Sequence, residues 1–130
     1  MTVIKTADLI GPALDWAVAT ALGWHRATIS GIDWGKRWTR PAPYGFWKED
    51  ECEFFAPSND PAQGYPILQR ERVSWDGTSY AVHPNFKPSP TGGDFHPIGM
   101  RGTNFLIAGL RCFVAQRLGD EIDIPMELLA

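Results

Sequence analysis

The residues that could hold a metal ion or attack a substrate are few and widely spaced. They are three histidines, two cysteines and one aspartate: His25, His83, His96, Cys52, Cys112 and Asp94. None of them has the short spacing of a zinc motif, such as His-x-x-x-His or Cys-x-x-Cys. We therefore expect no bound metal and no cofactor, and we expect the histidines to lie in loops or on the surface.

Two other routes to catalysis are weakly supported. Cys112 falls in an apolar helical segment, where a thiol is usually inert. The acidic run at residues 49–53 could supply paired carboxylates, although adjacent acids in a loop more often form a solvated surface. A small hydrolase would need two of these acids and two histidines to converge in one cleft: Glu51, Glu53, His83 and His96. The sequence therefore favours a binding protein over an enzyme.

Two charged residues lie inside apolar helical segments and raise the question of how they are accommodated. Asp15 lies in "ALDWAVATAL" and Arg111 in "FLIAGLRCFVAQRL". A buried charge is costly unless it meets a partner of opposite sign or several hydrogen bonds. One hypothesis is that the two helices pack together and Asp15 pairs with Arg111, while Trp16 covers a second layer of the core.

The alternative hypothesis is a ligand-binding cleft, because aromatic walls with a few directed polar groups are typical of small-molecule pockets. The walls would come from three aromatic residues: Trp16, Tyr65 and Trp75. A phosphate would be bound by Arg111, or by Arg101, which precedes a helix whose free N–H groups attract anions. Polar edges of the ligand would be bound by three residues that lie between the two helical segments: Asn59, Asp60 and Gln63.

Two helices must position these residues. Pro12 suits the first turn of a helix over residues 11–22, and Gly23 suits its end. Thr103 and Gly119 are the expected caps of a second helix, which is apolar nearly all round. We therefore expect the second helix to be buried on more than one side.

The segment between these helices begins with weak strand signals. We expect strands at residues 27–32 and 51–55, joined by an exposed loop. That loop contains the Trp-rich segment 34–47, in which three tryptophans lie among basic residues. The favoured interpretation is that these aromatic rings pack back on their own domain, although an exposed segment of this composition could also anchor a protein partner.

The second half of the chain predicts a hairpin and a long loop. Start signals before Pro61 and Pro66 predict two short helical turns that lead to a strand near residues 73–75. The "DGTS" stretch at residues 76–79 predicts the turn of a hairpin. Residues 84–102 contain four prolines and four glycines and predict a loop or lid, and the C-terminal tail predicts an edge strand.

Composition bounds the class of protein. The 130 residues predict one α+β domain over residues 1–130, with two main helices packed on a small, mainly antiparallel sheet and long Pro/Gly loops. A net charge of -3 with scattered basic residues argues against duplex nucleic acid. No apolar stretch approaches the roughly 20 residues that cross a bilayer. Two cysteines and the lack of a signal peptide pattern predict a cytoplasmic protein.

Three blocks of the sequence together resemble a known family. They are "TADLIGPALDWAVA", "PSNDPAQGYPILQRERVS" and "FLIAGLRCFVAQRLGDEIDIP", in this order, and they resemble the NinX-like family of small phage and prophage proteins. The resemblance implies a bacteriophage accessory gene product that works in the bacterial cytoplasm, and it brings no catalytic mechanism. The chain departs from the family pattern in a longer insertion around residues 31–50 and in the extended segment 84–99.

Residues and resemblance together predict a non-enzymatic accessory protein. The favoured function is binding, and sequestration, of a small nucleotide-derived signal of host defence. The alternative from another class is a protein-interaction module that modulates a host factor through the segment 34–47. A small hydrolase is the least favoured reading. A symmetric homo-oligomer is common for domains of this size and is a further expectation.

Overall fold

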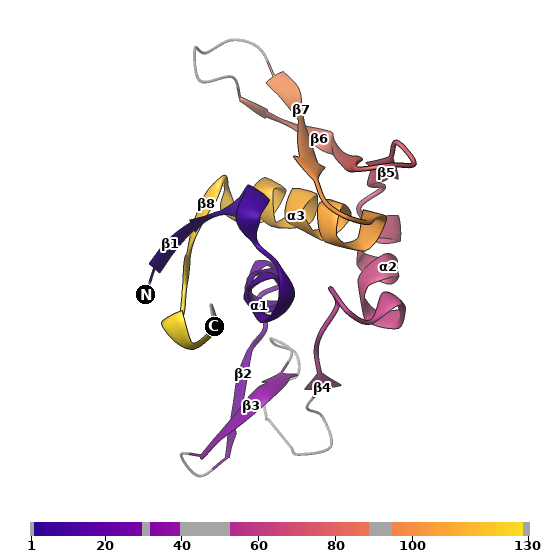
Figure 1. The fold of residues 1–130 in the computed structure, drawn as a ribbon. Helices are drawn as coiled ribbons and strands as arrows, with labels where there is room; N and C mark the ends of the chain where they lie inside the picture. The colour runs from indigo at the N-terminus through magenta and orange to yellow at the C-terminus, as the bar shows by residue number, and fades with distance from the viewer. Residues whose placement is uncertain (1, 30–31, 40–52, 89–94, 129–130) are drawn as a thin grey trace.

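The last helix organises the chain. The computed structural model describes four ranges: residues 2–29, 32–39, 53–88 and 95–128. Figure 1 shows α3 (Phe105–Leu118) across the middle of the molecule. It packs against α1 (Gly11–Ala21), α2 (Pro61–Arg70), β6 (Tyr80–Pro88) and β7 (Phe95–Arg101). The described residues therefore have the mixed α+β fold that the sequence predicts.

The sequence of α3 explains its central place. Its buried side chains lie on both of its sides: Leu106, Ala108, Leu110, Cys112, Phe113, Val114 and Ala115. A helix that is apolar nearly all round can bury surface against several neighbours at once. Gly119 ends the helix with a φ of 96°, as expected. The predicted Thr103 cap is wrong, because the Asn104 side chain accepts the N–H of Ile107 at 2.9 Å, and Asn is a stronger N-cap than Thr.

The first helix, α1, agrees with the prediction. It begins at Gly11, carries Pro12 in its first turn and ends at Ala21. Leu14 and Val18, one turn apart, are fully buried against the common core. The expected packing of α1 on α3 is confirmed.

The middle block forms one helix, α2, where two short turns are expected. Asp60 caps it by accepting the N–H of Ala62 at 3.0 Å, and the helix continues through Pro66 to Arg70. Proline removes one backbone hydrogen bond, that to the carbonyl of Ala62. Both residues are exposed, so water can satisfy that carbonyl and the helix tolerates the proline.

Glycines allow α2 and α3 to approach closely. A Cβ added to Gly64 would overlap the Leu106 side chain and the Pro57 carbonyl. A Cβ on Gly109 would lie 2.8 Å from the methyl groups of Leu68. Each helix therefore supplies a glycine at the point where the other supplies a leucine, and the contact depends on the missing side chains.

Three small antiparallel sheets surround the helices in the described part of the chain. β5 (Ser74–Trp75), β6 and β7 form one sheet, with Trp75 opposite Ala81 and Tyr80 opposite Arg101. The expected hairpin at residues 76–79 is confirmed, because the Asp76 carboxylate accepts backbone N–H groups across that turn. The expectation of an irregular loop over residues 84–102 is wrong for 84–88 and 95–101, where cross-strand pairing overrides the local proline and glycine signals.

The second sheet contains the start of the Trp-rich segment. It has the order β2 (His25–Ile29), β3 (Ile32–Thr39) and β4 (Glu53–Phe54). Strands were expected in this region, but residues 34–39 were expected in a loop and belong to β3 instead, because they pair with β2. Residues 40–47 of the segment lie outside the described residues, so its role as a protein anchor stays a prediction.

The third sheet joins the two ends of the chain. β1 (Thr2–Lys5) pairs with β8 (Glu121–Ile124), which is the strand expected in the tail. The short helical turns η1 (Thr6–Asp8) and η3 (Met126–Leu128) follow the two strands. Figure 1 places this sheet at one side of α1 and α3, away from α2. No helix in the four described ranges is long and apolar enough to span a membrane.

Candidate functional site

A pocket of about 390 Å³ lies where α2 ends beside the start of α3. It is lined by Tyr65, Leu68, Gln69, Arg72, Val73 and Phe105, and we call it the aromatic pocket. Tyr65, Gln69 and Arg72 are spaced by four and three residues, so they lie on one face of α2 and its end. All three side chains are exposed. The pocket therefore combines one exposed ring, one amide and one guanidinium.

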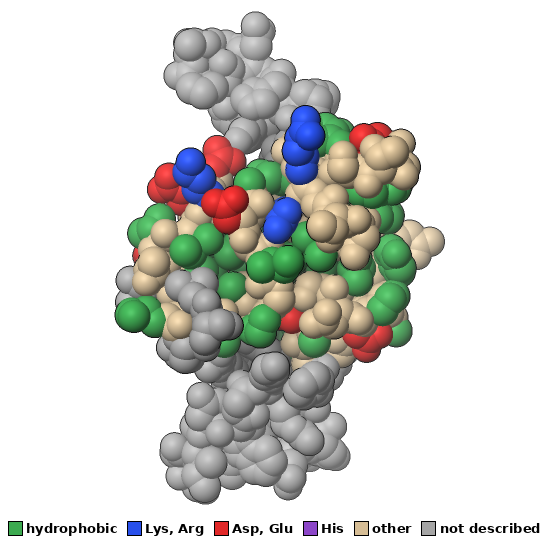
Figure 2. All heavy atoms as spheres, in the orientation of Figure 1, with side chains coloured by type: hydrophobic (Ala, Val, Ile, Leu, Met, Phe, Trp, Pro, Cys, Tyr) green, Lys and Arg blue, Asp and Glu red, His purple; other side chains and the backbone are tan. Residues whose placement is uncertain are grey.

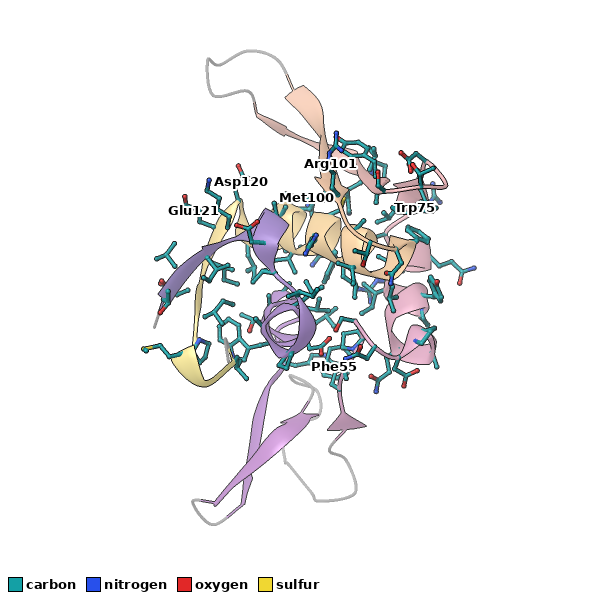
Figure 3. All side chains as sticks on the ribbon, viewed as in Figure 1. Phe55, Trp75, Met100, Arg101, Asp120 and Glu121 are labelled. Atoms are coloured by element: carbon teal, nitrogen blue, oxygen red, sulfur yellow. The ribbon has the colours of Figure 1, made fainter. Side chains whose placement is uncertain are left out.

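Two of the three aromatic residues expected in a cleft meet here through a third ring. The Tyr65 and Phe105 ring centroids are 5.9 Å apart at 40°, and those of Trp75 and Phe105 are 5.7 Å apart and stacked at 27°. Tyr65 is 45% exposed, whereas Trp75 on β5 is half-buried (Figure 3). The sequence hypothesis missed Phe105.

Arg72 is the cation of this pocket, and it too was missed. It has a φ of 57°, the left-handed conformation that favours glycine. This conformation ends α2: the N–H of Arg72 donates to Gln69 and the N–H of Val73 to Leu68, at 3.2 and 3.0 Å. The pocket thus presents a guanidinium from a position where a glycine would be the easier residue.

The two arginines proposed for a phosphate lie elsewhere. Arg111 is half-buried; its Nε donates to the Leu9 carbonyl and its Nη1 to the Arg101 carbonyl, both at 2.7 Å. Burial lowers the pKa of its guanidinium, and the charge of Asp8 acts in the opposite direction. The Arg101 side chain is exposed on β7 (Figure 3) and does not line the aromatic pocket. Arg111 therefore ties η1 and β7 to α3.

The predicted ion pair between Asp15 and Arg111 is wrong. Asp15 is 6% exposed, and its carboxylate accepts the N–H of Ser58 at 2.8 Å. Each charged group thus has a different partner: the Ser58 N–H for Asp15, and two carbonyls and the charge of Asp8 for Arg111. Asp15 holds the turn before α2 against α1. The Ser58 hydroxyl is buried with no hydrogen-bond partner among the described residues, so the contact depends on the Ser58 backbone.

The remaining predicted site residues are dispersed. Trp16 is half-buried against the hydrophobic core and does not line the aromatic pocket. Asn59 is exposed, and Asp60 caps α2. The Gln63 side chain accepts the N–H of Ala56 at 2.8 Å. The structure thus brings Tyr65 and Trp75 onto one ring, that of Phe105. Tyr65 lines the aromatic pocket, and the other predicted residues do not.

Gln63 belongs to a second pocket, of about 480 Å³, on another face of α2. This pocket is lined by Leu22, Trp24, Phe55, Ala62, Gln63, Pro66, Ile67 and Arg70. The Trp24 and Phe55 ring centroids are 4.6 Å apart. The two pockets share no lining residue, so they are separate.

A cluster of charges beside the aromatic pocket was not expected. His83 is 1% exposed, and its Nε2 lies 3.1 Å from a carboxylate oxygen of Glu71, which also contacts Arg117 at 3.4 Å and Arg70 at 3.5 Å. Burial opposes the ionisation of Glu71, but the hydrogen bond with His83 and the positive charge of Arg117 outweigh it and lower its pKa. The expectation of a surface or loop position is wrong for His83, because strand alternation puts it with Ala81 on the buried face of β6.

The other candidates for catalysis give no assembled centre in the described part. Cys112 is fully buried, its thiol donates to the Ala81 carbonyl at 3.2 Å, and burial raises its pKa to about 12, so the expected apolar position of this thiol is confirmed. Cys52, Glu51 and Asp94, and the side chains of Glu53, His25 and His96, lie outside what the structure describes. The described histidines, cysteine and acids contain no group of three that could hold a metal ion.

Comparison with known families agrees with the resemblance seen in the three sequence blocks. The family model described as bacteriophage P22 NinX matches residues 5–117. The match spans α1, α2 and nearly all of α3, and so includes the aromatic pocket. No curated protein matches the chain.

Proposed function

The chain belongs to the bacteriophage P22 NinX family, and from this membership we propose that it is a phage accessory protein that binds a small nucleotide-derived signal of host defence and sequesters it in the host cytoplasm. One observation carries the proposal: Tyr65, Phe105 and Arg72 line one pocket, and the Phe105 ring is held between the rings of Tyr65 and Trp75. Of the residues expected in the cleft, Tyr65 lines this pocket.

The size and chemistry of the pocket support a ligand of this class. A volume of about 390 Å³ falls within the roughly 300–1,000 Å³ of small-molecule pockets. The exposed Tyr65 ring can stack on a base, an interaction that contributes about 1–3 kcal/mol. The Arg72 guanidinium can donate charge-assisted hydrogen bonds to a phosphate, and the Gln69 amide can pair with a base edge.

Binding without turnover is proposed because of where the described reactive groups lie. The thiol of Cys112 and the imidazole of His83 are fully buried, and neither lines the aromatic pocket. A ligand held there meets the Tyr65 phenol, an amide and a guanidinium, and the described lining of the pocket contains no histidine, cysteine or carboxylate. The ligand should therefore leave the protein unchanged.

The direct test is isothermal titration with three defined probes, namely ADP-ribose, cyclic AMP and cyclic di-GMP. We expect at least one probe to bind with a 1:1 stoichiometry per chain. Tyr65→Ala should weaken the binding of that probe about tenfold or more, which corresponds to a loss of about 1.4 kcal/mol in binding free energy. Tyr65→Phe is the matched control, because it keeps the ring and should stay within about twofold.

Native mass spectrometry extends the test to ligands outside this panel. Protein purified from cells with active nucleotide-based defences should release an intact ligand on denaturation. If Tyr65→Ala binds a probe as tightly as the wild type, the site lies elsewhere. If no probe binds and the purified protein carries no ligand, the proposed function is rejected.

A further inference from the structure

Strand β1 forms an open edge of the fold. It pairs with β8 on one side, and no other described strand pairs with it. Thr2 and Ile4 are half-buried, whereas Val3 and Lys5 point outward. An edge strand presents unpaired N–H and C=O groups, which can pair with another chain unless charges, prolines or bulges protect it. The central residues Val3 and Ile4 offer no such protection.

Apolar surface gathers at the same end of the molecule. Val3, Ile10 and Met126 are the three most exposed large hydrophobic residues of the described part, at 58%, 57% and 68%. Val3 and Ile10 also line a pocket of about 550 Å³ together with Ile4 and Leu128. Figure 2 shows apolar side chains along the left margin, where Figure 1 places β1. The surface therefore offers both protruding apolar groups and a recess, as a self-complementary interface requires.

The charges at this end distinguish the two strands of the sheet. On β8 the outward residues are Glu121 and Asp123, both exposed. Opposed residues of an antiparallel pair point to the same face, so two β8 strands that keep their faces aligned must place these acids opposite acids. Like charges directly opposite each other are destabilising. The acids thus protect β8 against pairing with a copy of itself.

Two β1 strands can pair without placing like charges opposite each other. Alignment of the buried faces allows Val3 to lie opposite Val3 of a second copy, with Thr2 opposite Ile4 at each side. No charged residue then lies opposite a like charge over residues 2–4. Lys5 falls beyond this paired segment, and within its own chain it lies opposite Glu121 of β8. The sequence of β1 is therefore compatible with symmetric pairing.

We propose that this face binds a second copy of the chain through antiparallel pairing of the two β1 strands about a two-fold axis at Val3. The paired strands join two two-stranded sheets into one of four strands, in the order β8, β1, β1, β8. The exposed side chains of Ile10 and Met126 extend the interface beyond the backbone pairing. The aromatic pocket lies at the start of α3, whereas β8 follows the end of that helix (Figure 1), so the pocket stays open in such a dimer.

Sedimentation of the full chain tests the proposal, over a range from about 1 to about 100 µM because dimer formation depends on concentration. The wild type should approach twice the 14.5 kDa of one chain. Val3→Lys should sediment as a monomer, because two ammonium groups would meet at the axis. The monomer tolerates this change, since position 3 is exposed and lies opposite Asp123 in its own chain. Leu118→Lys, at the exposed end of α3, is the matched control and should leave the dimer intact.

A charge complementation experiment tests the register. Val3→Glu, made together with Asp123→Asn so that no like charges are opposed within the monomer, should also be monomeric, whereas an equimolar mixture of this variant and Val3→Lys should regain the dimer mass. A monomeric wild type at all these concentrations overturns the proposal, and so does a dimer that both variants leave unchanged. Sedimentation measures the dimer in the absence of any ligand. A negative result would therefore reject the proposed dimer and would leave the proposed binding function untouched.

Discussion

Two neighbouring residues at the end of α2 belong to very different regions. Glu71 points inward, contacts His83 and Arg117, and is held by hydrogen bonds and charges. Arg72 lies in a left-handed conformation and lines the aromatic pocket with an exposed side chain. The first region fastens α2 to the sheet and to α3, whereas the second keeps a strained conformation at an open surface. Strain of this kind is often kept where a side chain has a function.

The difference extends along the whole helix. Gly64, Ile67, Leu68 and Glu71 form the locked side of α2, which is packed against the core and α3. Tyr65, Gln69 and Arg72 form its open side. Substitutions on the locked side should therefore change the free energy of unfolding, and those on the open side should change ligand affinity. The following predictions test this division, from the largest expected effect to the smallest.

The largest effect is expected on the locked side at Gly64. Gly64→Ala adds a methyl group that overlaps Leu106 and the Pro57 carbonyl. The alanine gains helix propensity, but the backbone carbonyl cannot rotate away, so we expect a net loss of about 2 kcal/mol in the free energy of unfolding. Chemical denaturation measures it. Gln69→Ala, on the exposed side of the same helix, is the control and should change the stability by less than about 0.5 kcal/mol. Equal losses would remove the distinction between the two sides.

A smaller effect is expected at Glu71 and depends on pH. The pKa of Glu71 is lowered in the folded protein, so its carboxylate contributes stability above the ordinary glutamate pKa of about 4.3, and the contribution is lost as the pH falls through the lower folded value. Glu71→Gln should destabilise the protein at pH 7 and change it little near pH 2. Thermal unfolding across this range measures the difference. A stability deficit that is the same at both pH values would contradict an ionic role.

The sequence predicts those elements whose signals are local. Pro12 and Gly23 mark α1, Gly119 marks the end of α3, and the turn at residues 76–79 marks a hairpin, because each of these depends on backbone conformations within a few residues. The tail strand was also predicted. Its partner β1 was not, since that pairing joins positions more than a hundred residues apart.

The candidate site was less predictable, because contacts between distant segments create it. Tyr65 and Trp75 were chosen for their chemistry, but the Phe105 ring that joins them comes from α3. Asp15 and Arg111 were expected to pair because both needed a partner, and the fold offers each a backbone group instead. Strand alternation groups His83 with Ala81, but which face of β6 is buried depends on the packing of α3 on that strand. Composition identifies such residues, and only packing assigns their partners.

The smallest effect on stability, and the only one expected to be favourable, is at Arg72. A glycine adopts a φ of 57° without steric cost, so Arg72→Gly should raise the free energy of unfolding by up to about 1 kcal/mol. The same change removes the guanidinium of the aromatic pocket and should lower the affinity for a phosphate-bearing probe about tenfold. In this one variant, the free energy of unfolding measured by denaturation should therefore rise, while the affinity measured by titration should fall.

Arg72→Lys separates the two effects, because it keeps the positive charge and the backbone strain but loses the planar fork of donors. We expect its stability to equal that of the wild type and its affinity to lie between the wild type and Arg72→Gly. If Arg72→Gly gains stability and keeps full affinity, the arginine is not the anion contact and the open side binds its ligand through the aromatic rings alone. If it loses stability, the Arg72 side chain has a structural contact that outweighs the strain, and the contrast between the adjacent residues 71 and 72 fails.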